Sequence, residues 1–164
     1  MIEKPLQTAV ARLVETFSAR GITVGTAESC TGGLIAKLIT DIAGSSTVLA
    51  GGFVTYTNEV KTALLGVDPK IFEEHTEVSH ACAEAMAKGA RERLGCTRAV
   101  SATGYAGPGG GSEKDPVGTV YLGISAPDGT YSERFSAPVG STREEVRNAA
   151  AMRALEMLLE RAKM

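Results

Sequence analysis

The sequence predicts an α/β fold, a single three-layer α/β/α domain with a mixed sheet. Stretches with apolar residues at helical spacing alternate with short β-type runs, a pattern typical of helices packed on both faces of a sheet. Consecutive β-type runs joined by short connections in the second half add antiparallel strands to that sheet. The 164 residues, with 43% hydrophobic content, suit one compact domain, which we expect to span residues 1–164.

The first half alternates helices and strands. Apolar residues recur at helical spacing over residues 5–20 and stop at Gly21, and "ITVGTA" then indicates a strand. A second helix is expected after the glycine pair of "CTGG", before the β-type stretch "TVLAGGFVTYT". We expect Asn58 to cap a short helix and Ser79 to cap a longer one that ends near Leu94.

The second half is rich in strands and ends in a helix. The β-type runs "RAVSATGYA" and "VGTVYLGISA" flank the glycine-rich "GPGGGSEKDP", and Asp128-Gly129 indicates a hairpin turn into "TYSERFSA". Ser141 and Glu144 have the spacing of a capping box before the last apolar-periodic run. The predicted order is therefore α-β-α-β-α-α-β-β-β-α.

Composition narrows the classes of partner. Seventeen Lys+Arg against nineteen Asp+Glu give a formal net charge of -2, which disfavours nucleic acid and favours a small molecule. Three cysteines without C-x-x-C spacing indicate a reducing compartment. No apolar run is long enough to span a membrane, and the N-terminus lacks the apolar core of a signal peptide, so we expect a cytoplasmic protein without a membrane partner.

The stretch "TAESCTGG", residues 26–33, lies where a β-type run gives way to a helical one. A serine on such a turn is exposed beside helix-start amides that can hold an oxyanion, which makes Ser29 a candidate nucleophile. The alternative is that Ser29 only caps the following helix. The adjacent Cys30 has a thiol, which is intrinsically a stronger nucleophile than the serine hydroxyl. Adjacent residues on a turn point in different directions, however, so we expect this thiol to lie in the core.

A nucleophilic serine needs a base. His75 and His80 lie in the polar "EEHTEVSH", which indicates two solvated histidines, and their five-residue spacing fits a metal site poorly, so no metal is expected. Lys61 follows the strand "GFVTY" just inside a helix, and a lysine whose pKa is lowered can serve as base. Taken alone, Lys61 would be an ordinary solvated helix lysine. Tyr56 ends the same strand and could hold Lys61 or a substrate through its hydroxyl, or be an ordinary strand tyrosine.

The stretch "GYAGPGGGS", residues 104–112, has five glycines in nine positions. Such a run lets backbone N–H groups turn toward an anion, such as a phosphate or an oxyanion. A flexible hairpin is the alternative. The stretch matches neither the nucleoside-triphosphate loop nor the dinucleotide-binding motif, so both of those functions are disfavoured.

Together, "TAESCTGG", "DIAGSS", "GFVTYTNEVK", "GYAGPGGGS" with "PVGTV", and "REEVR" resemble the nicotinamide-nucleotide amidase family, also known as the CinA C-terminal domain. The resemblance runs from about Gly21 to the last helix. It implies hydrolysis of the carboxamide of nicotinamide mononucleotide to nicotinic acid mononucleotide and ammonia, in pyridine-nucleotide salvage, with no metal or other cofactor. Many relatives carry a further N-terminal domain, and this chain resembles the stand-alone form, with a homodimer expected on resemblance alone.

The resemblance also implies roles for individual residues. Ser29 would be the nucleophile, Lys61 its base and Tyr56 an assisting group. Thr103 and Arg143 match further positions that the family uses around the substrate. From the start of a helix, Arg143 could bind the nucleotide phosphate, or be an ordinary solvated arginine. Gly104, Gly107 and Gly109 of the glycine-rich loop could supply backbone N–H groups to the oxyanion. Glu28 could orient Lys61, but a nearby carboxylate would raise the pKa of that lysine, so we expect no catalytic role for it.

This chain departs from the family at two points. Relatives often have an aliphatic residue at Tyr105, and a lysine where Asp115 precedes the proline of "PVG". Two other functions stay open: a non-catalytic interaction or regulatory module in the DNA-damage or competence response, and an amidase that acts on another small amide. The presence of both Ser29 and Lys61 favours an enzyme.

Overall fold

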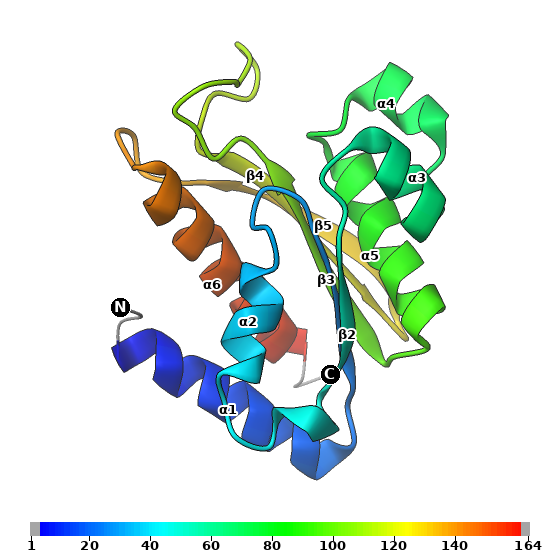
Figure 1. Cartoon of the computed structure of the whole chain (residues 1–164), viewed down its shortest axis with the longest axis vertical. Coiled ribbons are helices and arrows are strands. Elements are labelled where there is room, and N and C mark those ends of the chain that lie inside the picture. Colours follow the sequence, from blue (N-terminus) through cyan, green and yellow to red (C-terminus); the bar gives the residue numbers. More distant parts are fainter. Residues whose placement is uncertain (1–3, 162–164) are drawn as a thin grey trace.

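A five-stranded sheet flanked by helices organises the chain in the computed structural model, which describes residues 4–161 (Figure 1). The strands are β1 (Val24–Glu28), β2 (Leu49–Val54), β3 (Arg98–Gly104), β4 (Thr119–Ala126) and β5 (Gly129–Ser136). The helices are α1 (Lys4–Arg20), α2 (Leu34–Thr40), α3 (Asn58–Leu65), α4 (Pro69–His75), α5 (His80–Leu94) and α6 (Arg143–Arg161), with a short 3-10 helix η1 (Ser45–Thr47).

The sheet is mixed, as the sequence predicted. Its strand order is β2-β1-β3-β4-β5, in which β1 pairs in parallel with β2 and β3, whereas β4 pairs antiparallel with both of its neighbours, β3 and β5. Helices α1, α2 and α6 cover one face and α3, α4 and α5 the other, which confirms the three-layer α/β/α architecture (Figure 1). Because β1, β2 and β3 are parallel, their carboxyl ends meet at one edge of the sheet, where ligands bind in open α/β sheets.

The core consists of two layers of apolar side chains, one on each face of the sheet. On the face of α1, α2 and α6, the largest buried residues include Leu13, Phe17, Ile39, Leu155 and Leu158. On the other face, Gly89 of α5 lies against the backbone carbonyl of Leu65 at the end of α3. An added Cβ at Gly89 would overlap that carbonyl, so the glycine allows the close approach that sets the position of α3.

Two of the expected helix caps differ from the structure by one residue. Helix α3 is capped by Thr57, whose Oγ1 accepts from the Val60 amide, and not by Asn58. The capping box of α6 is formed by Thr142 and Glu145, which exchange hydrogen bonds with each other's backbone amides. In both cases the neighbouring residue is also of a type that caps helices, and the local backbone decided which side chain reached the helix start.

Other expectations for the helices are confirmed. Ser79 caps α5 by accepting from the Cys82 amide, and the chain turns at Asp128 between the antiparallel β4 and β5. One helix was missed: α4 begins at Pro69 behind Asp68, whose carboxylate accepts from the Lys70 amide. Asp-Pro is a recognisable helix start, so the sequence contained this signal.

Two kinds of feature are absent from residues 4–161. No helix in this range has both the length and the apolar composition that crossing a bilayer requires. No cluster of three or more His, Cys, Asp and Glu side chains in the same range has the proximity needed to hold a metal ion.

Candidate active site

A cavity of about 330 Å³ lies at the edge of the sheet where β1, β2 and β3 end. In Figure 1 the loop after β1, the start of α3 and the glycine-rich loop after β3 all lie at this end of the molecule. The cavity brings together segments far apart in the sequence. Its lining residues are Ser29, Cys30, Tyr56, Thr57, Asn58, Lys61, Glu77, Val78, Thr103, Gly104 and Tyr105.

Ser29 and Lys61, predicted as nucleophile and base, are in direct contact. The Lys61 Nζ atom donates to Ser29 Oγ at 3.3 Å and to the backbone carbonyl oxygen of Tyr56 at 3.3 Å. Tyr56 therefore contacts the amine through its backbone, while its hydroxyl, which could have held Lys61 or a substrate, accepts from Arg143. In the neutral amine, an N–H directed at the Tyr56 carbonyl would leave the nitrogen lone pair for the serine proton.

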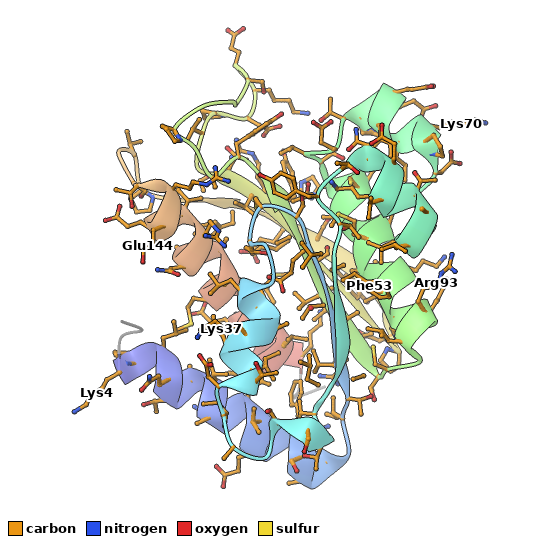
Figure 2. The ribbon with its side chains drawn as sticks, viewed as in Figure 1. Lys4, Lys37, Phe53, Lys70, Arg93 and Glu144 are labelled. Atoms are coloured by element: carbon orange, nitrogen blue, oxygen red, sulfur yellow. The ribbon has the colours of Figure 1, made fainter. Side chains whose placement is uncertain are left out.

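Lys61 is 1% exposed, which is unusual for a lysine. Figure 2 shows the ordinary arrangement, in which Lys4, Lys70 and Arg93 project outward from the ribbon. Burial lowers the pKa of Lys61 below its ordinary value, because the charged amine loses its hydration, while nearby Cys82 and Glu77 oppose that lowering. The solvated lysine that was the alternative is thus excluded, and the amine has the environment a lysine base needs.

The turn after β1 is held by contacts that leave few free amides. The Ser29 amide donates to the Ala102 carbonyl at 2.9 Å, and the carboxylate of fully buried Glu28 accepts from the amides of Ile35 and Ala36 at 2.8 and 3.1 Å. The helix-start amides that were expected to hold an oxyanion are therefore engaged by Glu28. This carboxylate anchors α2 and makes no hydrogen bond to Lys61, consistent with the expectation that it is not catalytic.

Cys30 is buried, as expected from its place beside Ser29. It belongs to the core on the face of α1, α2 and α6, although it also borders the cavity. Burial raises the pKa of its thiol to about 11, so the sulfur is protonated near neutral pH. A protonated thiol is a poor nucleophile, whereas Ser29 has a base within hydrogen-bonding distance.

The other predicted site residues are only partly brought together. Thr103 is buried, lines the cavity and donates to the Glu77 carbonyl at 2.7 Å, and Gly104 lies beside it. Arg143, at the start of α6, donates to the carbonyl of Gly107 at 2.7 Å and to the Tyr56 hydroxyl at 3.4 Å.

Gly107 therefore presents a carbonyl, and not an amide, to the predicted phosphate ligand Arg143. Within residues 4–161, neither it nor Gly109 is among the residues that line the cavity. Both histidines are exposed, as expected.

Two residues at the site were not predicted. Arg147, one helical turn after Arg143, donates to the carbonyls of Cys30 and Thr31 at 3.2 and 3.0 Å and so holds the turn that carries Ser29. Its four-residue spacing from Arg143 was the available signal, because both then share one helix face. Glu77 lines the cavity from the segment between α4 and α5, and no sequence signal distinguishes it from its acidic neighbours.

The fold and the site define an α/β protein with a buried serine–lysine pair at the carboxyl edge of its sheet. Residues 6–162 match the model of the CinA C-terminal domain. The chain belongs to this family, which confirms the resemblance to the CinA C-terminal domain seen in the sequence.

Relatives and solved structures agree with this assignment. CinA-like proteins from Myxococcus xanthus and Synechocystis are 51% and 50% identical, over 90% and 87% of this chain and 35% and 34% of their own lengths. The chain thus spans about a third of the length of the curated relatives it matches.

Among solved structures, the competence/damage inducible protein CihA from Agrobacterium tumefaciens superposes with a TM-score of 0.95 at 41% identity, covering 100% of this chain and 99% of that one. A CinA superfamily protein from Escherichia coli gives a TM-score of 0.90 at 30% identity, covering 98% and 93%.

Proposed function

We propose that this chain hydrolyses the carboxamide of nicotinamide mononucleotide to nicotinic acid mononucleotide and ammonia, in pyridine-nucleotide salvage. The observation that carries the proposal is the contact between the buried Lys61 amine and Ser29 Oγ at 3.3 Å, in a cavity at the edge of the sheet. A serine with a desolvated amine beside it is equipped for acyl transfer. The choice of substrate follows from the family resemblance of the motifs that carry these two residues.

The reaction would proceed through an acyl-enzyme. Ser29 Oγ bonds to the amide carbon as its proton passes to Lys61 Nζ. The carbon–nitrogen bond then breaks, and the same proton leaves with the nitrogen as ammonia. A water next gives a proton to Lys61 while its oxygen bonds to the acyl carbon, and the serine regains that proton as the acid departs. The balance is one amide and one water to one acid and one ammonia.

Backbone amides would stabilise the oxyanion that forms during the reaction, and an arginine would bind the phosphate of the substrate. Because the amides of Ser29, Ile35 and Ala36 are engaged, the amides of Cys30 and Thr31 are the candidate donors to the oxyanion. Arg143 is exposed beside the cavity-lining Tyr56, at the start of α6, where a phosphate could accept from its guanidinium.

A substrate panel tests this proposal. Ammonia release would be measured with nicotinamide mononucleotide, nicotinamide riboside, nicotinamide and unrelated small amides, each with EDTA present. We expect release chiefly from the mononucleotide, unchanged by EDTA, because neither proton transfer nor phosphate binding uses a metal in this mechanism. If the protein hydrolyses a different amide faster, that amide would replace nicotinamide mononucleotide as the proposed substrate. Release from none of them would favour the non-catalytic module.

A further inference from the structure

The cavity contains one acidic group, Glu77. Among the residues of the range 4–161 that line it, Glu77 supplies the only carboxylate and Lys61 the only amine. Burial raises the pKa of the Cys30 thiol to about 11 and raises the pKa of the Tyr105 phenol, so both groups are neutral near pH 7. When Lys61 is neutral and ready to accept a proton, Glu77 leaves this inner part of the site with a net negative charge.

The backbone around Glu77 is held firmly at the cavity wall. Thr103 Oγ1 donates to the Glu77 carbonyl, and Ser79 Oγ donates to the Thr76 carbonyl at 2.9 Å. Thr76 has a φ of 68°, a left-handed conformation that is costly for a β-branched residue. The neighbouring hydrogen bonds, including one from the Val78 amide to Thr76 Oγ1 at 3.3 Å, maintain this conformation.

The charge of Glu77 acts on groups around the cavity. It opposes the lowering of the Lys61 pKa and contributes to the raised pKa values of Cys82 and Tyr105. Glu77 therefore lies near both the base and the aromatic ring of Tyr105. Both residues line the cavity, and a cavity lined by a carboxylate and an aromatic ring attracts a flat cation.

We propose that Glu77 is a specificity-determining residue, which selects carboxamides attached to a cationic ring, that is, N-substituted pyridinium amides. This inference rests on the proposed function and explains its substrate by charge. The inner cavity contains Glu77, whereas Arg143 lies outside the lining, against the Tyr56 hydroxyl. A zwitterion with a cationic ring and an anionic phosphate matches this order of charges. The ring cation would also offset the effect of Glu77 on Lys61, so the base stays neutral while substrate is bound.

The test compares nicotinamide mononucleotide with benzamide riboside 5′-phosphate, a neutral analogue in which carbon replaces the ring nitrogen. We expect Glu77→Gln to lower kcat/KM for the cationic substrate about 10- to 100-fold, the usual effect of losing a contact to a charged group. The rate with the neutral analogue should change less than about threefold. The matched control is Glu73→Gln, the same charge change at an exposed residue of α4 that does not line the cavity.

Two further measurements separate selection by charge from a structural effect. Glu77→Asp keeps the charge and should restore part of the preference for the cation. Glu77→Gln should also move the pH–rate profile of the neutral analogue to lower pH, because the carboxylate that raises the pKa of Lys61 is removed. Equal losses on both substrates with an unmoved pH profile would overturn the proposal.

A binding experiment keeps this inference distinct from the proposed function. In the Ser29→Ala variant, calorimetry would compare the 1-methylnicotinamide cation with neutral nicotinamide, with Glu77 intact and with Glu77→Gln added. We expect tighter binding of the cation only where Glu77 is present. Equal binding of the two ligands to the Ser29→Ala protein would refute the role of Glu77, whether or not the double variant folds. A wild-type protein that prefers the cation but releases no ammonia would refute the amidase function alone.

Discussion

Replacing Lys61 with methionine isolates the proposed base from its packing. Methionine has an unbranched side chain of similar length and fills irregular buried space, but it cannot accept a proton. Because Lys61 is 1% exposed, water does not have free access to the vacated amine position. We therefore expect the rate of ammonia release to fall about 10²- to 10⁴-fold, the usual contribution of a general base, or about 3 to 5 kcal/mol in activation free energy.

The structure favours a loss of activity for Lys61→Met in the upper part of this 10²- to 10⁴-fold range, about 10⁴-fold. The Lys61 nitrogen is the only amine among the described lining residues, and Glu77 makes no hydrogen bond to Ser29 that could replace it. Lys61→Arg should lose as much activity, since a guanidinium stays charged in this pH range. The two variants bracket the role of charge: one is neutral, the other permanently cationic, and neither can act as the base.

Stability distinguishes these variants further. The pKa of Lys61 is lower in the folded than in the unfolded chain, so folding is disfavoured as the pH falls below the unfolded value and the amine must carry its charge. Methionine removes this cost. Lys61→Met should therefore raise the free energy of unfolding near neutral and acid pH, with a gain that disappears above the ordinary lysine range.

The assay is initial-rate ammonia release from nicotinamide mononucleotide, together with thermal unfolding of each variant. A Lys61→Met protein that unfolds at or above the wild-type temperature and keeps more than about a tenth of the activity would refute the assignment of Lys61 as base.

Activity should rise with pH from the acid side and level off below the ordinary lysine range, because burial lowers the pKa of Lys61 and only the neutral amine accepts a proton; a rate that falls from pH 6 to 9 would contradict this. Arg143→Ala should cost about 1.5 to 3 kcal/mol in kcat/KM with the mononucleotide but little with nicotinamide riboside, which has no phosphate. An equal loss on both would indicate a structural arginine. Ser29→Ala should abolish ammonia release while Cys30→Ala keeps most of it; the reverse result in folded proteins would make Cys30 the nucleophile. We also expect a homodimer by light scattering at micromolar concentration, and a monomer would overturn that expectation.

Local signals were enough for most of the fold. Helices, strands and the hairpin follow from apolar periodicity and turn residues, each of which acts over a few positions. The errors were local as well: at Thr57 and Thr142 a neighbouring polar residue competed for the cap, and α4 was overlooked behind Asp68. Strand order was not predicted, since it depends on which distant segments pair.

For the site, the sequence by itself determined that Ser29 lies on a strand-to-helix turn and, through its family motifs, that Lys61 is its partner. Only the tertiary structure decided that the Lys61 amine is buried, that Glu28 engages the amides of α2, and that Glu77 faces the same cavity. The physical reason is that a pKa and a hydrogen-bond partner depend on what packs around a group. Apart from the nearby Tyr56 carbonyl, the groups around Lys61 include Ser29, Glu77 and Cys82, which lie more than fifteen residues away along the chain, and no local pattern records them.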